Sequence, residues 1–324
     1  MNNLFKNIII VLFIAIVPLV YFHCDFNDMK SKATIGQMTI VVDENLQPLT
    51  LQLINDFQRL NPEAKVNVIF KPTKNTIADL FNKDTKLIII AGDLNPDDKK
   101  FADSNKIELQ RFEIGIDGIG FIVNPDNPAE RLTSDDIQKI FTGQYTDWTQ
   151  IKAQDDEQNT NVKNLMKGSL DKIKVYIQRP NSNTYNYVKD SVLYGLNYIK
   201  SAEICSTSVQ MLEEIRGNKN AIGIINMSWL SKGSQDLMDT TVKTIRVSKI
   251  WPNGRQDDFA QFHQGLIFTK KYPYSRKIVL YSRDFGIQLS TGFITYLVHN
   301  DGQKIVLDNG LVPINQPIRT IQIE

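Results

Sequence analysis

Strand-like and helix-like segments alternate along this chain, and this alternation constrains the fold more than any other feature. Residues 38–42 are β-branched after the initial Met38 and predict a strand, and residues 48–60 carry apolar side chains at helical spacing until Asn61-Pro62 stops them. The next strand, helix and strand are predicted at 66–70, 76–82 and 86–94. Strands that alternate with helices indicate βαβ units and a largely parallel sheet.

A second series of the same kind follows. We predict a strand at 115–128 closed by an Asn-Pro turn, a short helix at 134–143 capped by Ser134, and a polar loop or insertion at 152–169. Further along the chain, the predicted elements are a strand at 174–177 with a helix after it, a helix at 208–216, strands at 221–230 and within 272–282, and a helix at 287–308 that stops at Asn309-Gly310.

Length and charge bound the possible functions. A chain of 324 residues, 42% of them hydrophobic, is long enough for roughly two units that each bury a core. The net charge is +1 and no long basic run occurs, so nucleic-acid binding has no electrostatic footprint.

The first 24 residues have the layout of an export leader. Lys6 precedes a short apolar run, Ile8–Val20, which is shorter than a comfortable membrane span. Cys24 stands where a bacterial lipoprotein carries its lipidated cysteine, and residues 25–36 form a polar tether. A lipoprotein and an uncleaved anchor both fit this layout. In either case, most of the chain lies outside the cytoplasm, in a periplasmic or extracytoplasmic space.

The composition does not indicate catalysis. The three histidines lack metal-type spacing, and neither a nucleophile elbow nor a P-loop motif occurs. With Cys24 lipidated, Cys205 has no cysteine partner, and it is predicted to be a small buried hydrophobe. We therefore expect no enzymatic activity, no cofactor and no metal site.

The stretch IQRPNSNTYNYVKDSV, Ile177–Val192, is the strongest candidate for a binding loop. An arginine and a run of small polar residues stand between a strand and a helix. The uncapped N–H groups at such a helix start can be satisfied by a hydroxyl, by water or by a bound anion. From these residues alone, an ordinary helix cap and an anion-binding loop both remain open.

Four segments in order resemble one family. LTSDDIQKIFTGQYTDWTQI, NKNAIGIINMSWL, YPYSRKIVLYS and DGQKIVLDNGLVPI are similar to signatures of phosphate-type periplasmic substrate-binding proteins of ABC transporters. The resemblance covers roughly residues 38–314. Trp148, Gly223 and Pro313 within it mark the architecture more than the ligand.

The resemblance implies two doubly wound α/β lobes joined by a hinge of two crossings, with a ligand cleft between them. Lobe one would combine residues 37–118 with 255–324, and lobe two would be 119–254. The crossings would lie near 118–124 and 249–255. Such a protein acts as a monomer, closes on its ligand and hands it to a membrane permease.

The resemblance also implies three ligand loops. The first would be Asp43, Glu44 and Asn45, which depart from the family's hydroxyl-rich run and place carboxylates beside the anion. The second would be Gly92 and Asp93, where Asp93 matches an aspartate that can accept a hydrogenphosphate proton. The third would use the charge of one arginine and the polar groups of the helix start: Arg179, Asn181, Ser182, Asn183 and Thr184.

Two functions follow from these loops. The first is capture of phosphate or a related oxyanion for an ABC importer. The second is a non-transport binding or sensor module of the same fold whose ligand is altered or lost, and the carboxylates at Asp43 and Glu44 are its chief support.

Overall fold

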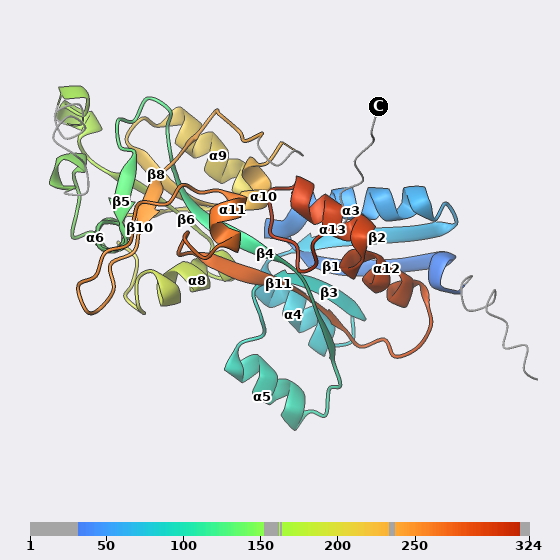
Figure 1. The fold of residues 1–324 in the computed structure, drawn as a ribbon. Helices are drawn as coiled ribbons and strands as arrows, with labels where there is room; N and C mark the ends of the chain where they lie inside the picture. The colour runs from blue at the N-terminus through green and yellow to red at the C-terminus, as the bar shows by residue number, and fades with distance from the viewer. Residues whose placement is uncertain (1–31, 152–161, 163, 233–236, 318–324) are drawn as a thin grey trace, which may run out of the picture.

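The structure is a computed structural model that describes residues 32–151, 162, 164–232 and 237–317. Figure 1 shows two α/β lobes side by side, with strands β4 (Gln110–Val123) and β11 (Ser275–Ser282) running through the middle of the molecule. The prediction of a two-lobed α/β fold is confirmed. The leader with Cys24 and most of the predicted polar loop at 152–169 lie outside the described residues.

One lobe is built on the N-terminal strands and includes the last helices of the chain (Figure 1). In addition to parts of β4 and β11, its elements are β1 (Gly36–Asp43), η1 (Glu44–Leu46), α3 (Gln47–Leu60), β2 (Ala64–Lys71), α4 (Thr73–Phe81), β3 (Leu87–Ala91), α5 (Pro96–Ser104), α12 (Leu289–Val298) and α13 (Asn300–Asp308). We call it lobe one.

The middle of the chain forms the other lobe, lobe two. Its elements are β5 (Arg131–Thr133), α6 (Ser134–Thr142), η2 (Trp148–Gln150), η3 (Gly168–Leu170), β6 (Lys174–Gln178), α8 (Asn183–Ser191), β7 (Glu203–Cys205), α9 (Ser208–Gly217), β8 (Ala221–Asn226), α10 (Met227–Leu230), β9 (Lys243–Thr244) and β10 (Arg246–Ser248). Helix α11 (Gln264–Phe268) lies on the path back to β11.

A continuous sheet connects the lobes. Within the described residues its order is β2-β1-β3-β11-β4-β8-β6-β7, and β9 pairs with β4. The first half of β4 pairs with β11, and the second half pairs with β8, so a single strand belongs to both lobes. β1 pairs in parallel with β2 and β3, and β6 pairs in parallel with β7 and β8, which is the arrangement that βαβ units produce.

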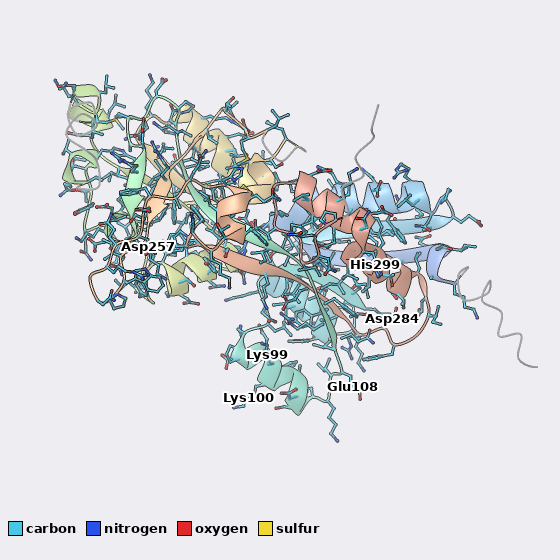
Figure 2. All side chains as sticks on the ribbon, viewed as in Figure 1. Lys99, Lys100, Glu108, Asp257, Asp284 and His299 are labelled. Atoms are coloured by element: carbon cyan, nitrogen blue, oxygen red, sulfur yellow. The ribbon has the colours of Figure 1, made fainter. Side chains whose placement is uncertain are left out.

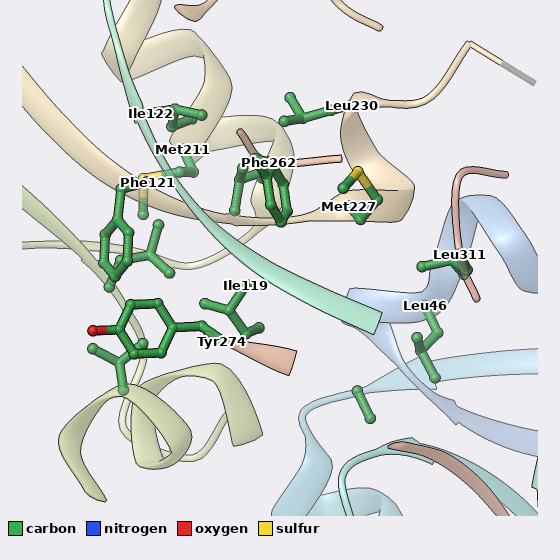
Figure 3. Packing of buried hydrophobic residues seen from close by; sticks show 14 of the residues in the cluster. Leu46, Ile119, Phe121, Ile122, Met211, Met227, Leu230, Phe262, Tyr274 and Leu311 are labelled. Carbon is green, nitrogen blue, oxygen red and sulfur yellow. The ribbon is translucent and has the colours of Figure 1, made fainter. Parts of the chain in front are cut away.

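The core follows these central strands. Figure 3 shows Ile119, Phe121 and Ile122 of β4 packed among side chains from α9, α10 and the segment that leads to β11. Phe262 and Tyr274 come from that segment and are almost fully buried. The residues that join the lobes are therefore part of the hydrophobic core.

Two sequence predictions about element ends are wrong. The cap of α6 is Thr133, not Ser134, because the Thr133 hydroxyl accepts from the Asp136 amide while the Asp136 carboxylate accepts from the Thr133 amide. The strand predicted at 221–230 ends at Asn226, and its last four residues form α10.

The helix predicted at 287–308 is interrupted. His299 has extended backbone angles, φ −98° and ψ 178°, and separates α12 from α13. Figure 2 labels His299 at this junction. Gly302 allows the turn, since a Cβ there would lie 2.4 Å from the Tyr296 carbonyl oxygen. Among the described residues, no helix combines the length and the apolar character that crossing a bilayer requires.

Candidate functional site

The polar loops at the ends of β1, β3 and β6 converge on the N-termini of α4 and α8. Contacts between the lobes mark this meeting point. The Asn183 amide donates to Thr73 Oγ1 at 2.9 Å, and the Lys74 amide donates to the Asn181 carbonyl at 3.2 Å. The start of α4 in lobe one thus touches the start of α8 and the loop before it in lobe two.

Asp43 is fully buried at the end of β1 and accepts several hydrogen bonds. Its Oδ1 accepts from the backbone and side-chain amides of Asn45, at 3.1 and 3.0 Å. Its Oδ2 accepts from Thr73 Oγ1 at 2.6 Å and from the Ala91 amide at 3.4 Å. The buried carboxylate of Asp43 thus satisfies donors from three segments of lobe one, which is what its burial requires.

Glu44 and Arg179 form an ion pair between the lobes. Arg179 donates to both carboxylate oxygens of Glu44, its Nε at 3.0 Å and its Nη2 to the second oxygen. Burial raises the pKa of Glu44 above its ordinary value, against the hydrogen bond and charge of Arg179. The arginine predicted to hold a ligand is therefore held by a carboxylate of the opposite lobe.

The start of α8 combines a cap with buried hydroxyls. Ser182 is the N-cap, and its hydroxyl accepts from the Tyr185 amide at 3.2 Å. The Thr184 hydroxyl is fully buried and donates to Asn226 Oδ1 at 3.2 Å. Asn181 lies farther out and donates from its side chain to Asn75 Oδ1 at 3.1 Å.

A buried ion pair lies directly behind this helix start. Asp117 of β4 and Arg276 of β11 occupy opposite positions of the antiparallel ladder, and their Oδ2 and Nη2 atoms are 3.3 Å apart. Burial raises the pKa of Asp117 above its ordinary value, against the attraction of Arg276. Asn226 also donates to Asp117, at 2.7 Å.

The ion pair reaches the helix start through Arg276. Arg276 donates to Asn183 Oδ1 at 2.8 Å and to Thr184 Oγ1 at 3.1 Å. β11 is therefore hydrogen-bonded directly to the first residues of α8, and β4 is linked to them through Arg276 and Asn226.

Asp93 has its partners elsewhere. Arg111 donates to its Oδ2 at 2.9 Å, and the Tyr281 hydroxyl donates to its Oδ1. Burial alone would raise its pKa, but the hydrogen bonds from Tyr281 and Arg111 hold the pKa below the ordinary value. Gly92 lies closer to α8, because a Cβ on Gly92 would lie 2.5 Å from Asn183 Nδ2.

A pocket of about 710 Å³ opens beside these loops, which is within the range of small-molecule sites. Its charged lining side chains balance, with Lys74, Arg276 and Lys277 against Asp93, Asp98 and Asp190. The polar and apolar remainder of the lining is Thr73, Ile77, Gly92, Asn95, Asn183, Asn186, Tyr187 and Ser191. In the part of the chain that the structure describes, no cluster of ligating side chains could hold a metal ion.

Sequence reasoning missed Thr73, Asp117, Asn226 and Arg276 as members of the site. The sequence does indicate that Asp117 is unusual, because burying a carboxylate within the apolar run GIDGIGFIV is unfavourable unless the carboxylate is paired. Arg276 stands in the quoted segment YPYSRKIVLYS, but its partner depends on a strand register that the sequence does not display.

Comparisons with known proteins agree with this architecture. Residues 29–301 match the model of the PBP superfamily domain. The chain is 24% identical to the phosphate-binding protein PstS of Bacillus subtilis, over 86% of this chain and 81% of the relative. It is 20% identical to the PstS of Borreliella burgdorferi, over 95% and 99%.

Solved structures share the fold. A substrate-binding protein of Clostridium perfringens, assigned to a phosphate ABC transporter and carrying bound phosphate, superposes with a TM-score of 0.69 at 20% identity. The match covers 86% of this chain and all of that one. An ABC-type phosphate transport receptor from Vibrio cholerae gives a TM-score of 0.61, also at 20% identity.

Proposed function

Because this chain belongs to the PBP superfamily, we propose that it is the substrate-binding component of an ABC importer that captures phosphate or a related oxyanion between its lobes. One observation carries the proposal. The loops of both lobes meet at the N-terminus of α8, where the side chains of Asn183 and Arg276 line an open pocket together with Thr73 and Gly92 of lobe one, and the buried Thr184 hydroxyl lies behind them on Arg276. Helix N-termini and guanidinium groups are common binding sites for oxyanions.

The relatives support phosphate as the ligand. The curated relatives from Bacillus subtilis and Borreliella burgdorferi are named as phosphate-binding proteins, and the Clostridium perfringens structure carries phosphate. We propose that the loop residues Asp43, Glu44, Asn45, Gly92, Asp93 and 179–184 surround the ligand, and that the protein delivers it as a monomer to a membrane permease.

Isothermal titration of the purified full-length protein tests this function. We expect phosphate to give a saturable heat signal that persists when salt is raised, because groups inside a cleft are screened less than surface charges. Sulfate serves as the matched competitor. An absence of heat with both anions would refute oxyanion capture.

We also propose that the N-terminus tethers the protein to the outer face of the membrane through a lipid on Cys24. The apolar run before Cys24 supports this placement. Cys24→Ser should release the protein from the membrane fraction or block its processing, measured by fractionation and by the mass of the mature chain. A variant that stays membrane-bound with the same mass as the wild type would instead indicate an uncleaved anchor.

A second candidate function has one specific observation in its favour. Asp43 and Glu44 already accept hydrogen bonds from Asn45 and Arg179, two residues predicted to bind an anion, and Asp43 also accepts one from Thr73. A binding or sensor module with an altered ligand would show this pattern. The titration separates the two functions, because such a module would give no signal with phosphate.

A further inference from the structure

Arg276 is an incompletely satisfied cation at the edge of the pocket. Its side chain is 3% exposed, and it lines the pocket together with Asn183 and Gly92. Its Nε has no hydrogen-bond partner among the described residues, and the same holds for Oδ1 of its partner Asp117. Buried polar atoms are rarely left without partners, so this cluster has capacity for a further polar group.

The side chain of Asn183 stands between Gly92 and Arg276. Its Nδ2 lies where a Cβ on Gly92 would come within 2.5 Å, and its Oδ1 accepts from Arg276 Nη1 at 2.8 Å. A neutral amide oxygen is a weaker partner for a guanidinium N–H than an anionic oxygen. The amide therefore occupies a position that suits an oxyanion better.

The other arginine of the cleft is engaged differently. Arg179 donates to both carboxylate oxygens of Glu44, so an incoming anion would have to displace a carboxylate. At Arg276 Nη1, by contrast, the anion would displace only the neutral amide of Asn183. The lower cost of displacement favours Arg276 as the cation that the ligand reaches.

We propose that Arg276 recognises the anionic group of the ligand and that Asn183 is the specificity-determining residue that covers it. The phosphoryl oxygen replaces Asn183 Oδ1 on Arg276, and the amide swings aside. The Thr184 hydroxyl, already 3.1 Å from Arg276, stays beside the bound oxygen. This inference rests on the proposed function, because it takes the ligand to be an oxyanion.

Asn183→Ala, titrated with inorganic phosphate, tests the covering role. The variant removes the competing acceptor, and we expect affinity to rise by about tenfold or more, since a hydrogen bond to a charged group is strong enough for such a change. Asn105→Ala is the control and should leave phosphate affinity unchanged, because Asn105 is an exposed residue at the end of α5 whose side chain donates to the Phe101 carbonyl. Unchanged or weaker phosphate binding by Asn183→Ala would overturn the proposal.

The double variant Asp117→Asn with Arg276→Gln tests the recognising role. Removing both charges together avoids leaving one buried charge alone, which is the change most apt to unfold the protein. We expect phosphate affinity to fall by up to about a hundredfold. A folded double variant that binds phosphate like the wild type would overturn the proposal, and if the double variant does not fold, the Asn183→Ala result decides.

The outcomes separate this inference from the function it rests on. Phosphate binding by the wild type, together with unchanged affinity in Asn183→Ala, leaves oxyanion capture in place and rejects the role of Asn183 and Arg276. If the wild type does not bind phosphate but Asn183→Ala clearly does, oxyanion capture by the native protein is rejected. The proposal that Asn183 covers Arg276 is then supported. No binding by either protein rejects both.

Discussion

The fold shifts the pKa values of the Glu44 and Glu113 carboxylates in opposite directions. Burial raises the pKa of Glu44 despite the ion pair with Arg179, whereas hydrogen bonds from Lys277 and Arg111 lower the pKa of Glu113. The difference follows from exposure, since the side chain of Glu44 is 15% exposed and that of Glu113 is 33% exposed. When an ion pair is buried, the attraction between its charges does not always compensate for the free energy of the hydration that is lost.

The sign of the pH dependence follows for Glu44. Its pKa is raised in the folded state, so the folded protein binds more protons than the unfolded chain as pH rises above the ordinary value of 4.5. Ionisation of Glu44 therefore costs stability over that window. Glu44→Gln should match or exceed the wild type in stability at about pH 7.5, by up to roughly 1 kcal/mol, and this advantage should disappear near pH 4.

Urea unfolding at the two pH values provides the measurement. Glu113→Gln is the matched control and should behave in the opposite way, because a lowered pKa stabilises the fold above the ordinary value and the benefit is lost as pH falls. A Glu44→Gln variant that is clearly less stable than the wild type at neutral pH would show that the pair with Arg179 is a net stabilising contact.

At the scale of helices and strands, the sequence predicts most elements and the position of the loops. Hydrophobic periodicity is a local property, so β1, α3, β3 and α9 lie within a few residues of their predicted ranges. The ends depend on backbone angles and on contacts that periodicity does not register. His299 interrupts an otherwise continuous helical pattern because its backbone is extended, and α5 lies in a stretch where no helix was predicted.

The sequence predicts where the candidate site lies, but not which of its residues pair with one another. Strand ends and helix starts identify residues 43–45, 92–93 and 179–184, because loops at the carboxyl ends of parallel strands converge. The pairing of Glu44 with Arg179 joins positions 135 residues apart, and the pairing of Asp117 with Arg276 depends on register. Neither distance nor register can be read from a single chain without its fold.

For the molecule as a whole, the central feature is the double connection between the lobes. β4 makes the first passage, and β11 lies antiparallel to it. Val247 of β10 pairs with Ala260, so the chain from 247 to 260 folds back on β10. β10 in turn pairs with β5, which keeps this hairpin in lobe two. We therefore propose that lobe two extends past the boundary expected at residue 254, and that the return passage lies between Phe262 and Arg276.

Phe262 holds the two passages together. Its ring lies over Gly118 and Gly120 of β4, where an added Cβ would come within 2.6 and 2.5 Å of ring atoms. Phe262 is 2% exposed, and its ring centroid lies 5.1 Å from that of Tyr272 (Figure 3 labels Phe262 in the core). The glycines are thus required by close packing, and the ring has little room to move.

Gly120→Ala should consequently destabilise the protein by about 1–3 kcal/mol in urea unfolding, the usual cost of overpacking a core. Gly217→Ala at the end of α9 is the control, because nothing lies within 4 Å of the added Cβ, and its stability should stay near that of the wild type.

Phe262→Ala alone should cost about 3–5 kcal/mol. In the double variant Gly120→Ala with Phe262→Ala, the penalty at Gly120 should largely vanish, because the clashing ring is gone. Strictly additive losses would show that Phe262 does not couple the two passages.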